Sequence, residues 1–182
     1  MSTTPRDLIL CCLAGDEAAV VELVDLYRDR VFRFCYRMLG QHQDAEDAAQ
    51  ETFVRVFRSL AAWDRDREFE PWLLAIAGNR CRTMLAARKR IPTTGLVAEE
   101  QLIDRRPDGA LLRSLREEVQ LALLGLRPEH REAFVMFHEN GLSYDQIADA
   151  IRRPLGTVKT WIHKARQQLM AQLRQRDVVG AR

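Results

Sequence analysis

The longest stretch of one charge sign in the chain runs from Arg152 to Arg176. It contains seven basic residues and no Asp or Glu. Lys and Arg on one face of a helix bind phosphates, and they also donate hydrogen bonds to guanine edges in the major groove. A second stretch without acids, Pro71 to Ala98, contains five basic residues. Both stretches favour a polyanionic partner, although solvated helix faces are the simpler alternative.

An acidic segment without Lys or Arg lies between Met38 and Val54. It contains four carboxylates within eight residues, Asp44, Glu46, Asp47 and Glu51. Such a surface is chemically suited to an electropositive protein. The sequence therefore predicts a protein partner that is separate from the polyanion.

Candidate catalytic and metal-binding groups are few. The four cysteines form no C-x-x-C pair and have no metal-ligand spacing with the four histidines. Cys35 lies on an apolar helical stripe, so a core position is favoured over a nucleophile. No Gly-rich phosphate loop and no H-E-x-x-H motif occurs. We therefore expect no enzyme activity, no metal and no cofactor, with free thiols in a reducing cytoplasm.

Composition favours an all-α fold. The 182 residues are 47% hydrophobic and 7% aromatic, with 28 basic and 26 acidic side chains and only 9 Gly and 6 Pro. These values exclude a disordered chain and a many-turned β fold. The longest apolar run, Leu8 to Ala14, is far shorter than the roughly 20 residues of a membrane span. We expect a cytoplasmic protein without membrane insertion.

Helical periodicity divides the chain into two small domains. Residues 1–90 contain a helix that ends at Gly40, a second capped by Asp44, and a third with Pro71 in its first turn. Residues 91–112 read as a flexible linker because turn-forming residues interrupt the period. Residues 113–182 form the second domain, in which Pro128 opens a helix.

The second domain contains a predicted helix-turn-helix. Ser143 and Gln146 form a capping box at the first of its two helices. The second helix, starting at Gly156, has the inward stripe Val158, Ile162, Ala165 and Leu169. Its DNA-contacting residues would then be Thr157, Lys159, Thr160, His163, Lys164 and Arg166. A plain helical hairpin with a solvated cationic face is the alternative.

Three segments, in order, resemble bacterial sigma factors of the sigma-70 family, extracytoplasmic-function (ECF) type. D-A-E-D-A-A-Q-E-T-F at Asp44 and F-E-P-W-L-L-A-I-A-G-N-R at Phe69 resemble their region 2. L-S-Y-D-Q-I-A-D-A-I-R-R-P-L-G-T-V-K-T-W-I-H-K-A-R at Leu142 is similar to their region 4. The resemblance covers residues 8–173 and implies a non-catalytic specificity subunit that directs core RNA polymerase to promoters.

The resemblance also implies residue roles. Core polymerase, with its β′ and β subunits, would bind at Asp44, Asp47, Gln50, Glu51 and Phe53. The minus-10 strand would be held by Asn79, Arg80, Arg82, Arg88, Lys89 and Arg90, and the cationic recognition helix would read minus-35 DNA. An anti-sigma factor is an expected further partner.

Alternatives remain for single residues and for the whole chain. Asn79 suits a flipped base, but a surface amide or a local cap is the simpler role. Trp72 is expected in the core, and Trp161 either packs inward or touches DNA. A helix-turn-helix regulator with a ligand or dimerisation domain is the main competing function, and it leaves the Asp44 to Phe53 segment without a role.

Overall fold

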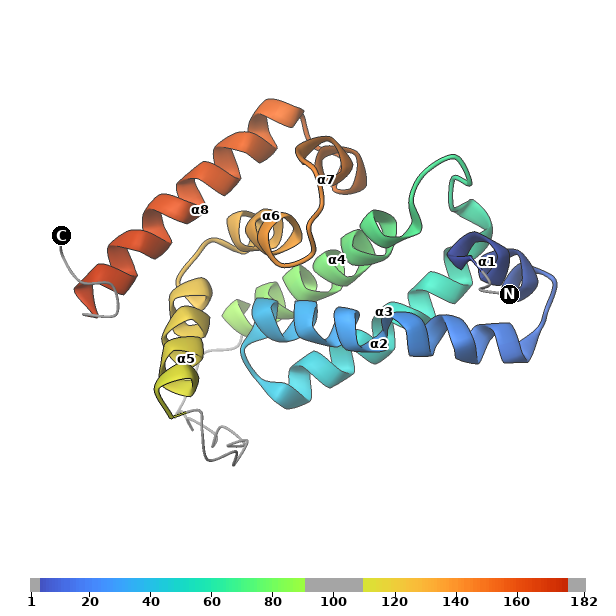
Figure 1. The fold of residues 1–182 in the computed structure, drawn as a ribbon, viewed down its shortest axis with the longest axis horizontal. Coiled ribbons are helices and arrows are strands. Elements are labelled where there is room, and N and C mark those ends of the chain that lie inside the picture. The colour runs from blue at the N-terminus through green and yellow to red at the C-terminus, as the bar shows by residue number, and fades with distance from the viewer. Residues whose placement is uncertain (1–3, 91–109, 177–182) are drawn as a thin grey trace.

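The computed structural model describes residues 4–90 and 110–176, and these residues are arranged as helices joined by short turns (Figure 1). The first half contains α1 (Pro5–Leu13), α2 (Glu17–Leu39), α3 (His42–Ser59), the short 3₁₀ helix η1 (Leu60–Ala62) and α4 (Phe69–Arg90). The second half contains α5 (Ala110–Leu124), α6 (Pro128–His138), α7 (Tyr144–Ala150) and α8 (Leu155–Gln175). The all-α prediction is confirmed. The predicted linker lies outside the described residues except for its last three positions, which belong to α5.

Local sequence signals account for several helix ends. Asp16 caps α2, because its carboxylate accepts from the amides of Ala18 and Ala19 at 2.9 and 3.2 Å. Gly40 ends the same helix at φ 79°, a left-handed conformation that glycine adopts without strain. Ser143 and Gln146 form the predicted capping box at α7.

The core of the first half lies where α2, α3 and α4 pack together. The side chains of Val31, Phe34 and Met38 are fully buried on α2. Leu73 and Cys81 of α4 face them. Cys35 is also fully buried, as expected for a core thiol. Each such apolar side chain contributes about 1.5–3 kcal/mol to folding.

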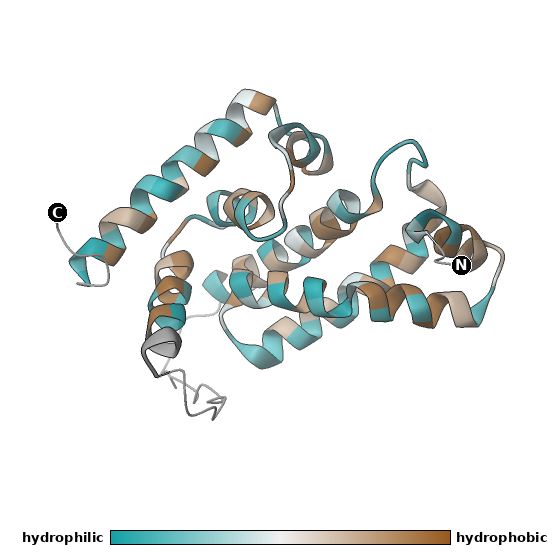
Figure 2. Ribbon diagram, in the orientation of Figure 1, coloured by the Kyte–Doolittle hydropathy of each residue, from teal (hydrophilic) through white to brown (hydrophobic). Residues whose placement is uncertain are grey.

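In the second half, α6 and α7 pack against α8. The predicted inward stripe of α8 is buried at all four positions, Val158, Ile162, Ala165 and Leu169. Ile147 and Ala148 of α7 are buried at the crossing. Figure 2 shows the result along α8, where hydrophilic residues alternate with the apolar ones. The helix-turn-helix arrangement is therefore present.

Two sequence predictions about helix boundaries are wrong, and one helix was not predicted at all. The second long helix starts at His42, and Asp44 lies in its first turn instead of capping it. The residue before the helix, Gln41, has an extended backbone and makes no side-chain cap bond. The last helix starts at Leu155, one residue earlier than predicted. Residues 5–13 form a helix that was not predicted, with Leu8 and Ile9 buried against the first half.

The two halves pack directly against each other. Helices α5 and α6 contact α2, and helices α6 and α7 contact α4. In Figure 1, α6 lies between α4 and α8. The sequence predicted two domains but gave no sign of this contact between them.

Candidate nucleic-acid interface

Helix α8 presents a cationic outer face. Lys159, Thr160, His163 and Lys164 are all exposed. The Lys159 ammonium nitrogen lies 5.9 Å from the centroid of the Tyr144 ring. This cation–π contact does not neutralise the charge of Lys159. The Thr160 hydroxyl donates to the Gly156 carbonyl at 2.8 Å. Thr157 is half-buried at the start of the helix.

Two residues of α8 have more restricted positions than the exposed lysines. Arg166 donates through Nε to Nε2 of His138 at 2.9 Å, so its guanidinium is held against α6. Trp161 is half-buried and packs on the core, with its ring 6.0 Å from that of His130. Trp161 therefore packs inward in this arrangement.

Helix α4 carries the second group of candidate DNA contacts. Asn79 and Lys89 are exposed, and Arg80 is half-buried. The Asn79 carbonyl accepts from the Thr83 hydroxyl at 2.9 Å, which leaves the Asn79 side-chain amide unused by that contact. Arg90 is the last residue of α4, and its side chain lies outside the described part of the chain.

The other two cations of α4 are paired with acids. Arg82 forms an ion pair with Glu132 of α6, and Arg88 forms one with Asp44 of α3. Burial lowers the pKa of Arg88. Burial raises the pKa of Glu132, and the nearby Arg82 opposes this shift. Both arginines are thus engaged in ion pairs with residues of the same chain.

The acidic candidates on α3 differ in their exposure. Asp47 and Gln50 are exposed. Glu51 is half-buried and pairs with Arg55 at 2.8 Å, one helical turn away. Phe53 is half-buried and packs against the core. Since Asp44 is held by Arg88, the free polar surface of this helix centres on Asp47 and Gln50.

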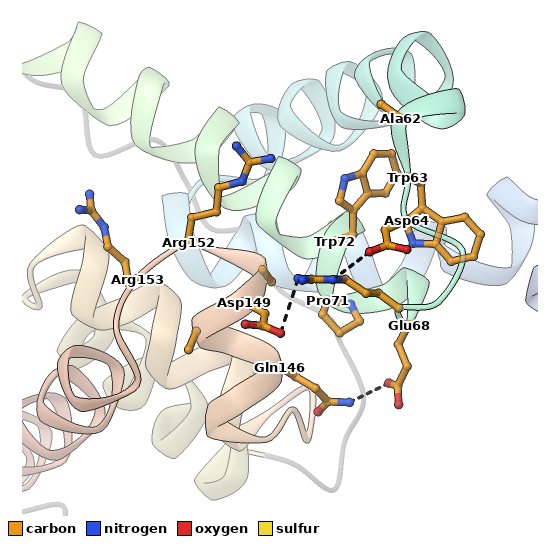
Figure 3. A pocket seen from close by; sticks show the side chains of 13 residues that line it. Ala62, Trp63, Asp64, Glu68, Pro71, Trp72, Gln146, Asp149, Arg152 and Arg153 are labelled. Atoms are coloured by element: carbon orange, nitrogen blue, oxygen red, sulfur yellow. Dashed lines mark hydrogen bonds and ion pairs between the residues drawn. The ribbon is translucent and has the colours of Figure 1, made fainter.

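A cavity of about 710 Å³ lies between the loop before α4 and helix α7 (Figure 3). Trp63 and Trp72 line one side, and Arg152 and Arg153 line the other. Gln146 donates to the Glu68 carboxylate across it at 2.8 Å. Trp72 also packs against Phe69, with ring centroids 5.6 Å apart, which supports its predicted core role.

Sequence reasoning missed two buried charged residues of α6. Arg131 is 3% exposed and donates to four backbone carbonyls, including that of Met38. Burial lowers the pKa of Arg131 to about 10. Glu132, beside it, is 1% exposed. Both faces of α6 are covered by other helices, and the sequence of one helix does not show its long-range neighbours.

Two helical modules, one ending in a cationic helix-turn-helix, are typical of a DNA-binding protein. The chain matches the family models for sigma-70 region 2 over residues 23–91 and sigma-70 region 4 over residues 116–169. It belongs to the sigma-70 family, ECF type. Such a sigma factor recognises promoters for RNA polymerase at transcription initiation and is a non-catalytic specificity subunit.

Two curated relatives illustrate the similarity. The ECF RNA polymerase sigma factor SigW of Bacillus subtilis is 35% identical over 173 residues, covering 88% of this chain and 91% of that protein. The ECF RNA polymerase sigma factor SigE of Mycolicibacterium smegmatis is 41% identical over 175 residues, covering 92% and 68%.

Solved structures share the fold. CnrH, solved in complex with the cytosolic domain of CnrY, has a TM-score of 0.70 and 24% identity, covering 94% of this chain and 97% of that chain. The sigma factor RpoE of Bartonella quintana, solved with the anti-sigma factor NepR, has a TM-score of 0.65 and 21% identity, covering 84% and 95%. No helix in the two described ranges is long and apolar enough to cross a membrane.

Proposed function

We propose that this sigma factor reads the minus-35 element with the outer face of α8. The main supporting observation is that Lys159, near the start of α8, and Lys164, near its middle, are both exposed, and neither forms an ion pair with the described residues. Ammonium groups at such positions reach guanine edges or phosphates in a major groove. Thr160 and His163 lie on the same face and complete the contact surface.

The melted minus-10 strand is assigned to α4. The exposed Asn79 amide offers both a donor and an acceptor to a base edge. Arg80 and Lys89 supply charge for the phosphates of a single strand. Arg82 and Arg88 join them once their acidic partners are released, and Arg90 follows directly in the sequence.

Core polymerase is assigned to the exposed side of α3. Asp47 and Gln50 are available there, and the half-buried Glu51 and Phe53 border them. The β′ subunit is the partner that the family resemblance places at this helix, and we assign β as a further contact of the core. Asp44 becomes available to the polymerase when Arg88 leaves it for DNA.

An anti-sigma factor is an expected regulator. The sigma factor RpoE of Bartonella quintana was solved in complex with the anti-sigma factor NepR, and CnrH was solved with the cytosolic domain of CnrY. The proposed binding to RNA polymerase and promoter DNA also predicts that the protein acts in the cytoplasm, because both partners are in the cytoplasm.

Binding to core polymerase tests the assignment of α3. In a titration of labelled protein against core enzyme, Gln50→Ala with Glu51→Ala should weaken binding by about 1–3 kcal/mol. The matched control is Asp25→Ala with Arg28→Ala, which removes an exposed ion pair on α2 (3.3 Å) and should leave binding unchanged. Equal affinity of the first variant and the wild type would falsify the assignment of α3.

In vitro transcription tests the function as a whole. Core enzyme with this chain should start transcripts at discrete sites in a promoter library, and core enzyme alone should not. A helix-turn-helix regulator that acts without the polymerase would bind DNA yet fail to comigrate with core enzyme in size-exclusion chromatography. That result would contradict the proposed role of α3.

A further inference from the structure

Two aromatic rings, Tyr144 of α7 and Phe137 of α6, are stacked on each other within the second half of the chain. Their centroids are 4.5 Å apart, and their planes are inclined by 24°. Both side chains are half-buried and pack against the core. Aromatic pairs bury large areas and prefer defined geometries, so each ring limits the movement of the other. The stack is therefore a firm support for side chains that contact it.

Each ring of this stack contacts one cation of α8. The Lys159 ammonium nitrogen lies 5.9 Å from the centroid of Tyr144, and the Arg166 guanidinium carbon lies 5.5 Å from that of Phe137. Both distances are within the limit of about 6 Å for a cation–π contact. Lys159 and Arg166 are seven residues apart, so they lie on one face of the helix, separated by about 10.5 Å along its axis. The stack thus supports two cations on the proposed DNA-binding face.

The two cations depend on the stack to different degrees. Arg166 also donates to His138 at 2.9 Å, so a second contact orients its guanidinium. Within the two described ranges, the Tyr144 ring is the only group that makes a polar or cation–π contact with the Lys159 ammonium. Lys164, farther along the helix, contacts no aromatic ring in these ranges. Loss of the Tyr144 ring would therefore leave the Lys159 ammonium unrestrained.

A lysine that reads a base must be directed more narrowly than a lysine that binds a phosphate. A phosphate accepts an ammonium group from many directions, whereas the O6 and N7 acceptors of guanine lie at fixed positions in the major groove. The lysine side chain is a flexible four-carbon stem that loses rotamer freedom when it binds. A side chain that is already oriented in the free protein loses less of this freedom on binding. Orientation before binding therefore favours the base contact in particular.

We propose that Tyr144 is a positioning residue that determines how sharply Lys159 discriminates among the bases of the minus-35 element. The Tyr144 ring orients the ammonium near the start of α8, the part of a recognition helix that contacts base edges, and Phe137 supports the ring from behind. Tyr144 lies on α7 and acts through Lys159 without touching the base itself. This inference rests on the proposed role of α8 in reading the minus-35 element and adds to it a specificity-determining residue outside α8.

Competition binding by the holoenzyme, assembled from core polymerase and the full chain, tests the proposal. The competing promoter fragments differ at single base pairs of the minus-35 element. Tyr144→Leu keeps an apolar side chain but removes the ring, and it should reduce discrimination at the base pair read by Lys159 about two- to fivefold, the factor that one exposed cation–π contact supports. Tyr144→Phe keeps the ring face and should discriminate like the wild type. Unchanged or sharper discrimination in Tyr144→Leu would overturn the proposal.

A ratio of affinities separates positioning from a loss of folded protein. An unfolded fraction lowers the apparent affinity for every fragment by the same factor, so the ratio does not change. Phe134→Leu is the matched control, because Phe134 is also a half-buried ring of the second half, and its aromatic contact is with His138. Its ratio should equal that of the wild type. In a Lys159→Ala background, adding Tyr144→Leu should not change the ratio further, and a further change would refute the action through Lys159.

Nuclear magnetic resonance of the free full chain tests the contact without DNA. The ring current of Tyr144 should shift the ε-methylene protons of Lys159 upfield. This shift should disappear in Tyr144→Leu and persist in Tyr144→Phe, and its absence from the wild type would refute the contact. Failure of the proposed function has a different signature, because Lys159→Ala would then leave every minus-35 ratio unchanged although the upfield shift is present.

Discussion

Arg166 on α8 donates a hydrogen bond to Nε2 of His138 at the end of α6, with a donor–acceptor distance of 2.9 Å. The guanidinium also lies 5.5 Å above the Phe137 ring. The bond requires a neutral His138 whose Nε2 carries the lone pair. An arginine that sequence reasoning assigned to DNA therefore also joins α8 to α6.

The Arg166 to His138 bond should make the second half sensitive to acid. Burial, and then the charge of Arg166, lower the pKa of His138. A lowered folded-state pKa of a histidine means stability that is present above its ordinary value of about 6.5 and is lost as the pH falls through the folded value. Urea denaturation should show the free energy of unfolding decreasing over that window. His138→Gln should reduce this dependence but not remove it, because the pKa of His130 is also lowered. An unaltered pH profile in His138→Gln would contradict the account.

Lys159 and Arg166 should differ as DNA contacts. Lys159→Ala should cost about 1–3 kcal/mol of binding and relax the preference at one base pair of the minus-35 element. Arg166→Ala should weaken binding to all sequences alike, because its guanidinium is held at α6 and away from base edges. Competition binding against a set of minus-35 variants measures both. Identical relative affinities for wild type and Lys159→Ala would show that Lys159 contacts only the backbone.

The salt dependence of minus-35 binding counts the cations that reach DNA. Seven basic residues lie between Arg152 and Arg176, but Arg176 is paired with Glu118 at 2.9 Å, and one helix cannot point all of the others at a single duplex. If about four reach phosphates, log affinity should fall with log salt at a slope of about −3.6. Fluorescence anisotropy over a range of potassium chloride concentrations gives the slope. A slope near zero would leave α8 without a role in DNA binding.

Asn79→Ala should impair strand opening more than duplex binding. The exposed amide lies beside Arg80, and its own backbone carbonyl is already satisfied by Thr83. Removing it should lower permanganate reactivity of the minus-10 thymines in complexes with polymerase, with little effect on minus-35 affinity. Thr83→Ala is the control on the same helix face. Normal opening in Asn79→Ala would place the base pocket elsewhere.

Arg131→Met should lower the free energy of unfolding by about 3 kcal/mol, because it leaves buried carbonyls without a donor. Arg131 bonds to Leu123, Leu124 and Leu126 at the end of α5, where the helix dipole also favours a cation. Arg127→Met, at an exposed site one turn away, should change it by less than about 0.5 kcal/mol. Urea denaturation followed by circular dichroism compares the two. Equal stabilities would mean that solvent replaces the guanidinium.

Local patterns in the sequence determined most of the secondary structure and the outward face of α8. The period of Val158, Ile162, Ala165 and Leu169 identified the buried stripe, because spacing along one helix fixes which side chains share a face. The same holds for the Ser143 capping box and for Gly40, whose partners lie within a few residues. The helix at residues 5–13 was missed because residues 8–14, which overlap most of it, were considered only as an apolar run.

Only the tertiary structure decided which charged groups are free. Asp44 and Arg88 were assigned to different interfaces, yet they form one ion pair, because α3 and α4 bring together residues 44 positions apart. Arg82 reaches Glu132 across 50 positions, and Arg131 reaches the end of α2 across 93. The sequence pattern shows the charge of each side chain and its position on its own helix. Pairing depends on the packing of helices that are distant in the chain, and the pairing decides which cations can meet DNA.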